Sequence, residues 1–225
     1  LSNMIRIGRL FLAFGIVIPS YIFLSIIFFF IYDRSQAARL ARIRMRYCQI
    51  VLHLMRVRIH VENQEPLKLS AEKKLLVANH VSIIDVLAIG ALHEVDFITS
   101  TDVAAIPYVG KIAAASGSIF VNRQNRAKIH EEIAEVAERL QYTHVGLFPE
   151  GTSTDGTHIL RFRRPFFRSA VLARVKTIPI RIAYTRINGE PIDLKHRDQI
   201  FVYGPISVLT HVWRIFGHSS IEMSI

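Results

Sequence analysis

Residues 75–92 read L-L-V-A-N-H-V-S-I-I-D-V-L-A-I-G-A-L, a pattern typical of a strand that passes through a polar turn into a helix. Leu75–Ala78 is a short, continuous apolar run and predicts a buried strand. Ile83–Leu92 predicts a helix. Between them, Ser82 and Asp85 match the S-x-x-D pattern, in which a serine caps a helix and an acid at the third helical position reaches back. We therefore expect the helix to begin at Ser82.

His80 and Asp85 can pair only if the helix begins between them. On one continuous helix, five positions at about 100° each would leave the two side chains roughly 140° apart. With Ser82 as the cap, the carboxylate of Asp85 reaches back to the turn and can accept from one imidazole nitrogen of His80. The other nitrogen is then free to act as a general base, and a substrate hydroxyl can be the nucleophile that attacks a thioester. The alternative is a helix cap beside a surface histidine.

A second polar motif, F-P-E-G-T-S at Phe148–Ser153, follows the apolar run at residues 145–147. Glu150 would lie at the carboxyl end of a strand, where open α/β sheets place their ligand contacts. Its carboxylate could accept hydrogen bonds from substrate hydroxyls, and Gly151 would let the backbone approach a ligand closely. The alternative is a tight turn with a solvated glutamate. Together the two motifs suggest acyl transfer.

The rest of the chain alternates strands and helices. Further strands are predicted at Val95–Thr99, Ser118–Val121, His144–Phe148 and Thr177–Tyr184. Further helices are predicted in part of Ala104–Ala115, and at Arg126–Gln141 and Phe166–Arg174. In the predicted helix at Arg126–Gln141, the solvent-facing side chains should be Glu131, Glu132, Glu135 and Glu138. This alternation predicts an α/β fold with a largely parallel central sheet flanked by helices.

The composition favours a partner at a membrane surface. The chain has 225 residues, a formal net charge of +10 and 51% hydrophobic residues, and its mean hydropathy is +0.30. A soluble nucleic-acid-binding protein of this charge would rarely be so apolar, whereas anionic lipid attracts a basic surface. The single cysteine, Cys48, excludes an intramolecular disulfide and a metal site built from several cysteines.

An N-terminal segment is predicted to anchor the chain in a membrane. Leu10–Tyr32 contains 23 residues without a charge, and a helix of that length spans about 30 Å of hydrocarbon. Pro19 lies in the middle of this run, so the sequence leaves open a full span or a re-entrant pair of helices. Arginines follow the run in excess, at positions 34, 39, 42, 44 and 46. This asymmetry places the following domain in the cytoplasm.

The segment from Ser35 to about Val57 is predicted to be an amphipathic helix. Its apolar face would contain Leu40, Ile43, Tyr47, Ile50, Val51 and Leu54, with the arginines largely elsewhere. Such a helix can lie at the level of the lipid headgroups. It can equally pack on the domain and expose its basic face. We divide the chain into an anchor with this helix at 1–58 and a catalytic domain at 59–225.

Arg123 and a cluster of three later arginines are candidates for phosphate binding. Arg123 follows the predicted strand at 118–121 and could pair with a phosphate in bidentate fashion. Arg161, Arg163 and Arg164 follow the loop that contains Gly156. The alternative is a solvated or ion-paired side chain for Arg123 and an exposed face for the three others.

Four blocks of the sequence resemble, in order and spacing, the glycerolipid acyltransferase family of 1-acylglycerol-3-phosphate O-acyltransferases and their relatives. These blocks are N-H-x-x-x-x-D at 79–85, G-S-I-F-V-N-R at 117–123, F-P-E-G-T at 148–152 and I-P-I at 178–180. The resemblance covers about residues 70–185, and the leading apolar segment is similar to the membrane anchor of that family.

The resemblance implies a role for each matching residue. His80 would be the general base and Asp85 its partner. Arg123 would bind the phosphate of the acceptor, and Glu150, Gly151 and Thr152 would help to hold the acceptor. The acyl donor would be acyl-CoA or acyl carrier protein, without a metal or another cofactor.

The implied function is a membrane enzyme on the cytoplasmic face of a bacterial inner membrane that converts lysophosphatidate to phosphatidate. The chain departs from the family at 162–165, where F-R-R-P replaces the usual F-K-x-G. G-T-S-T-D-G at 151–156 also occurs in relatives that acylate lyso-ornithine lipids, so that acceptor stays open. A non-catalytic lipid-binding protein is the alternative from another class. The uncharged run disfavours nucleic-acid binding.

Overall fold

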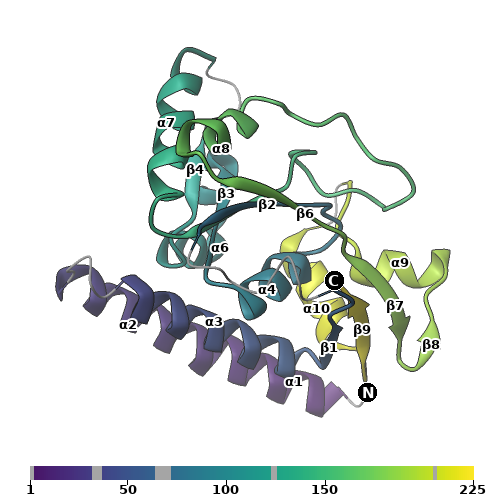
Figure 1. The fold of residues 1–225 in the computed structure, drawn as a ribbon. Helices are drawn as coiled ribbons and strands as arrows, with labels where there is room; N and C mark the ends of the chain where they lie inside the picture. The colour runs from purple at the N-terminus through teal and green to yellow at the C-terminus, as the bar shows by residue number, and fades with distance from the viewer. Residues whose placement is uncertain (1–2, 32–36, 64–71, 123–125, 205–206) are drawn as a thin grey trace.

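A five-stranded parallel sheet forms the centre of the molecule (Figure 1). The computed structural model describes residues 3–31, 37–63, 72–122, 126–204 and 207–225. The strand order is β4-β3-β5-β2-β6. The strands are β2 (Lys74–Ala78), β3 (Val95–Ser100), β4 (Ile119–Val121), β5 (His144–Leu147) and β6 (Lys176–Ile180). The predicted α/β class with a parallel sheet flanked by helices is confirmed.

Strand β2 is buried on both faces because helices cover both sides of the sheet. Leu75 and Val77 belong to the core under α7 (Ile129–Arg139) and α8 (Phe167–Ala173). Leu76 and Ala78 belong to the other core, with α3 (Ala37–Leu54) and α4 (Ile83–Leu92). Successive side chains of a strand point to opposite faces, so a continuous apolar run is required here.

A second, smaller sheet was not predicted. Its order is β1-β9-β7-β8, with β1 (Val57–His60) parallel to β9 (Ile221–Ser224) and the other pairs antiparallel. Strands β7 (Ala183–Ile187) and β8 (Glu190–Pro191) complete it. The single strand predicted at Thr177–Tyr184 is wrong, because β6 belongs to the central sheet and β7 to the second sheet.

Asn79 holds the chain where β6 gives way to β7. Its side-chain oxygen accepts from the backbone N–H of Ile182 at 2.8 Å, and its amide donates to the carbonyl of Ile182 at 3.0 Å. These two bonds satisfy the backbone N–H and C=O of Ile182, which lies between the end of β6 and the start of β7. The residue before His80 therefore fixes the start of the strand that carries Tyr184.

The remaining helices connect the strands or cover their ends. They are α5 (Thr101–Ala104), α6 (Val109–Ala115), α9 (Leu194–Ile200) and α10 (Val208–Phe216), with a 3₁₀ turn at Arg126–Lys128 before α7. Pro107 lies between α5 and α6, because a proline lacks the N–H that would continue the helix through this point.

The N-terminal segment forms one helical run from α1 (Asn3–Phe11) through a π-helical stretch, η1 (Leu12–Val17), to α2 (Ile18–Ile31). Pro19 cannot donate to the carbonyl of residue 15, and the π-helical stretch immediately before it accommodates this missing bond. This run lies alongside α3 beneath the central sheet (Figure 1). It also contacts α6 and α10.

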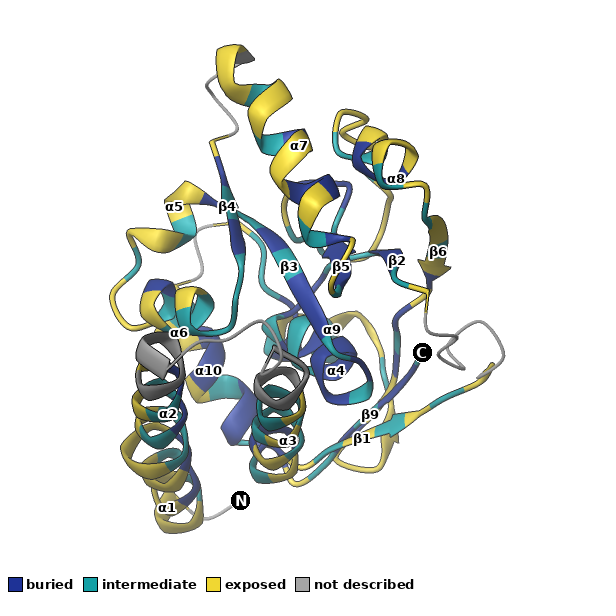
Figure 2. Cartoon of the chain, turned by 60° about the vertical axis from the view of Figure 1, so that its left-hand side comes forward, coloured by how far each residue is buried: buried dark blue, intermediate teal, exposed yellow. Residues whose placement is uncertain are grey.

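One side of the N-terminal run is apolar and exposed, as the outer surface of α1 and α2 shows in Figure 2. Its large exposed side chains include Met4, Ile7, Phe11, Ile16, Phe23 and Ile26. Within the described ranges, Asn3–Ile26 is long and apolar enough to cross a membrane, with a mean hydropathy of 1.9. The other side of the run packs on the domain, so the apolar side chains named here remain exposed.

Helix α3 packs on the domain through both apolar and charged side chains. Arg44 forms a 2.8 Å ion pair with the buried carboxylate of Asp96, whose other oxygen pairs with Arg139 of α7 at 2.7 Å. Val51 is buried as predicted, but Ile50, predicted on the same face, is exposed. The expectation of arginines away from the packed face is thus wrong for Arg44, because Asp96 gives it a partner inside the domain.

Candidate active site

The turn between β2 and α4 has the predicted cap. Ser82 is in an extended conformation, its side chain accepts from the backbone of α4, and the Asp85 side chain accepts from the Ser82 N–H at 2.9 Å. The same carboxylate oxygen, Oδ2, accepts from the N–H of Val81 at 2.7 Å. The reciprocal capping box predicted from S-x-x-D is confirmed, and α4 begins between His80 and Asp85.

The capped turn brings the predicted histidine and aspartate together. Nδ1 of His80 lies 2.9 Å from Oδ2 of Asp85. The side chain of His80 keeps 20% of its surface exposed, whereas that of Asp85 keeps none. Because the buried carboxylate of Asp85 accepts a hydrogen bond from Nδ1–H of His80, Nε2 of the imidazole is left as the proton acceptor. The arrangement is that of a base and its orienting acid.

Tyr184 contacts the second oxygen of the carboxylate, a partner that sequence reasoning missed. Its hydroxyl donates to Oδ1 of Asp85 at 2.6 Å from strand β7. Burial, and then the charge of Asp85, raise the pKa of Tyr184 well above its usual value, so the phenol stays protonated. Four donors therefore surround Asp85, which satisfies this buried carboxylate.

His211 of α10 lies behind the cap and was also missed. Its Nε2 is 3.2 Å from Oγ of Ser82. Burial lowers the pKa of His211 to about 4 although the charge of Asp85 opposes this shift, so the imidazole is neutral near pH 7. The cap that positions Asp85 is thus supported from the C-terminal part of the chain.

The second motif lies against the first, through Phe148. The ring of Phe148 stacks on the imidazole of His80 with centroids 4.2 Å apart, and the Thr154 N–H donates to the carbonyl of His80 at 3.0 Å. Glu150 is buried, and its Oε2 accepts from the N–H of Leu160 at 2.8 Å. The structure thus shows Glu150 holding its own loop, whereas Phe148 makes the direct contact with His80.

The other predicted binding residues lie at this edge or outside the described residues. Gly151 has φ +74°, and a Cβ there would come within 2.5 Å of Nε of Arg163. The glycine thus allows both the turn and the passage of the arginine side chain over it. Thr152 is exposed. Arg123 lies outside the described residues.

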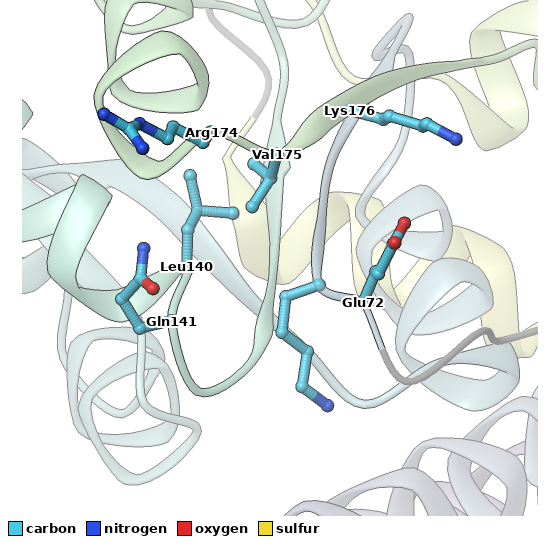
Figure 3. Close-up of a pocket in the computed structure, with 7 residues that line it drawn as sticks. Glu72, Leu140, Gln141, Arg174, Val175 and Lys176 are labelled. Carbon is cyan, nitrogen blue, oxygen red and sulfur yellow. The ribbon is translucent and has the colours of Figure 1, made fainter.

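Two of the hollows among the described residues lie beside the central sheet. The first, of about 460 Å³, lies at the carboxyl ends of β3, β4 and β5 beside Phe148. We call it the carboxyl-edge cleft. The second, of about 500 Å³, lies at the amino ends of β2 and β6, with Glu72, Arg174 and Lys176 around it (Figure 3). Phe148 links the first of these to His80, because Phe148 lines the cleft and its ring stacks on the imidazole.

The structure is thus an α/β protein whose parallel sheet has a hydrogen-bonded histidine–aspartate pair at its carboxyl edge. The chain belongs to the Acyltransferase family, whose model matches residues 58–183. That match contains both motifs and all five strands of the central sheet.

Named relatives differ in their acceptor. The chain is 30% identical over 181 residues to the lyso-ornithine lipid O-acyltransferase of Rhizobium meliloti, a match that covers 76% of the chain and 60% of the relative. It is 29% identical over 152 residues to the 1-acyl-sn-glycerol-3-phosphate acyltransferase of Neisseria gonorrhoeae, covering 67% and 57%. The chain therefore spans about 60% of the length of these relatives.

A solved structure shares the fold. The crystal structure of the 1-acyl-sn-glycerophosphate acyltransferase PlsC from Thermotoga maritima matches with a TM-score of 0.64 and 16% identity, over 99% of this chain and 83% of that one. At this identity the likeness supports the architecture, including the N-terminal helical segment.

Proposed function

We propose that this chain transfers an acyl group from a thioester donor to the free hydroxyl of a membrane lysolipid, with His80 as the general base. The observation that carries the proposal is the His80–Asp85 pair, which leaves Nε2 of the imidazole as a proton acceptor beside the carboxyl-edge cleft. The donor is acyl-CoA or acyl carrier protein.

The reaction needs one base that later acts as an acid. His80 Nε2 takes the proton of the acceptor hydroxyl as the oxygen attacks the thioester carbonyl. Collapse of the tetrahedral intermediate breaks the C–S bond, and the imidazolium returns the proton to the leaving thiolate. Asp85 stabilises the imidazolium between these steps and keeps its ring oriented.

Two acceptors are candidates. The first is 1-acyl-sn-glycerol-3-phosphate, which would give phosphatidate, with Arg123 as the proposed phosphate contact and Glu150, Gly151 and Thr152 near the acceptor. The second is a lyso-ornithine lipid, which the names of the relatives from Rhizobium meliloti and Brucella abortus favour. Both acceptors carry a free hydroxyl and an anionic group.

The acceptor is a membrane lipid, and the exposed apolar side of α1 and α2 supports membrane association. We propose that this side enters the lipid and keeps the cleft near the headgroups. The arginine excess after the apolar run favours the cytoplasmic face of a bacterial inner membrane.

A panel of acceptors and donors tests the proposal. We expect the purified chain in lipid micelles to esterify lysophosphatidate, lysophosphatidylethanolamine or lyso-ornithine lipid, with acyl-CoA or acyl carrier protein as donor. Product formation is measured by mass spectrometry of the extracted lipid. If no combination yields product while the protein binds the micelles, it is a lipid-binding protein on an acyltransferase scaffold.

Tyr184→Phe should slow this reaction. Loss of the hydroxyl leaves Oδ1 of Asp85 with one donor fewer, so the carboxylate that orients His80 is held less firmly. We expect kcat to fall about tenfold at pH 7, in the range of one charge-assisted hydrogen bond. KM should change little, because Tyr184 is buried behind Asp85. A fall in kcat that matches the loss of folded protein, measured by circular dichroism, would show that Tyr184 only stabilises the fold.

A further inference from the structure

The carboxyl-edge cleft is mostly apolar, and its lining includes one acidic and one basic side chain from two different elements. Its apolar lining includes Ile98, Val121, Ile129, Leu147, Phe148 and Phe166. Glu132 from α7 and Arg163 from the loop after the second motif also line it. An apolar pocket with a few placed polar groups is the usual form of a small-ligand site, in which those groups determine specificity.

Glu132 faces this cleft instead of solvent, contrary to the prediction from the sequence. It follows Ile129 by three positions, so the two side chains share one face of α7. Oε1 of Glu132 accepts from the backbone N–H of Asn122 at 2.7 Å. Oε2 is buried without a hydrogen-bond partner, and across the described ranges Glu132 forms no ion pair.

A carboxylate in this position makes one side of the cleft negative. A partly buried charge is screened less by solvent than a surface charge, and Glu132 has no ion-pair partner among the residues that the structure describes, so its effect on a nearby ligand is larger than that of a surface charge. A ligand ammonium would be attracted, and a phosphate monoester with up to two negative charges would be repelled.

Arg163 supplies the opposite charge. Its side chain passes over Gly151, where a Cβ would come within 2.5 Å of Nε. It forms no ion pair with the residues that the structure describes. A headgroup with both an ammonium and an anionic group would complement the two sides of the cleft.

We propose that Glu132 makes the carboxyl-edge cleft selective for an acceptor whose headgroup carries an ammonium group as well as an anionic group. The inference rests on the proposed acyl transfer to a lysolipid. Lyso-ornithine lipid and lysophosphatidylethanolamine have such zwitterionic headgroups, whereas lysophosphatidate has only the phosphate. Glu132 acts through its charge and is a specificity-determining residue, not a catalytic one.

Glu132→Gln tests the proposal because it removes the charge and keeps an oxygen for the Asn122 N–H. The measured quantity is the ratio of kcat/KM for lyso-ornithine lipid to kcat/KM for lysophosphatidate in mixed micelles at equal surface concentration. We expect the wild-type ratio to exceed one and the variant to lower it about tenfold. The matched control is Glu131→Gln, the same charge change at an exposed neighbour, which should leave the ratio unchanged.

Further outcomes keep the inference separate from the proposed function. Glu132→Lys should lower the ratio beyond the glutamine variant, so a series that does not order as Glu, Gln, Lys contradicts the inference. A wild-type chain that prefers lysophosphatidate contradicts it without any variant, and leaves acyl transfer to a lysolipid intact. A wild-type chain that acylates none of the three acceptors overturns both.

Discussion

His80→Ala should abolish acyl transfer while leaving the fold and membrane association intact. Nε2 of His80 is the proposed acceptor of the substrate proton, and alanine offers no group that could replace it. A positioned general base contributes on the order of 10²–10⁴ in rate, so we expect kcat to fall by about 10³ or more. The measurement is the initial rate of product formation with the acceptor that the wild type uses best.

His130→Ala is the matched control, because His130 is an exposed histidine on α7. We expect it to retain wild-type kcat. Flotation with vesicles that contain anionic lipid should recover both variants and the wild type alike, since the exposed apolar side of α1 and α2 is unchanged. A His80→Ala variant with more than a tenth of the wild-type rate would show that another group removes the proton.

The local geometry at His80 could be predicted because one short stretch determines it. The spacing of His80, Ser82 and Asp85 is compatible with a contact only if a helix begins between them, and the S-x-x-D pattern supplies that start. The parallel sheet could be predicted from short, continuous apolar runs between predicted helices. A strand requires such a run only when both of its faces are buried. These features depend on neighbours in the sequence.

The rest of the site depends on neighbours in space. Tyr184 lies 99 residues after Asp85, and His211 lies 129 residues after Ser82. Nothing near either residue in the sequence marks it as a partner of the turn. Helical periodicity placed Glu132 in solvent. Periodicity shows which residues share a face of a helix, but it does not show which loop or strand end packs against that face. Arg44 was misplaced for the same reason, because its partner Asp96 belongs to another element.

Asp85→Asn should lower kcat severely while changing the fold little. An asparagine can direct its oxygen to the three donors at Oδ2 and its amide to the Tyr184 oxygen, so most of the hydrogen bonds survive. What it cannot supply is the negative charge that stabilises the His80 imidazolium. We expect kcat to fall by about 10²–10⁴, as for other orienting acids, with KM within about threefold of the wild type. Steady-state kinetics and a thermal melt separate the two effects.

Asp85→Ala separates the charge of this residue from its hydrogen bonds. Alanine leaves the N–H groups of Val81 and Ser82 and the hydroxyl of Tyr184 without their buried acceptor. Each unmet donor costs about 1–3 kcal/mol, which is a large part of the stability of a domain. The alanine variant should therefore melt well below the asparagine variant although both lose activity. If the asparagine variant kept more than a tenth of the wild-type kcat, the role of Asp85 would be to build the turn, and His80 would act as a base without help from its charge.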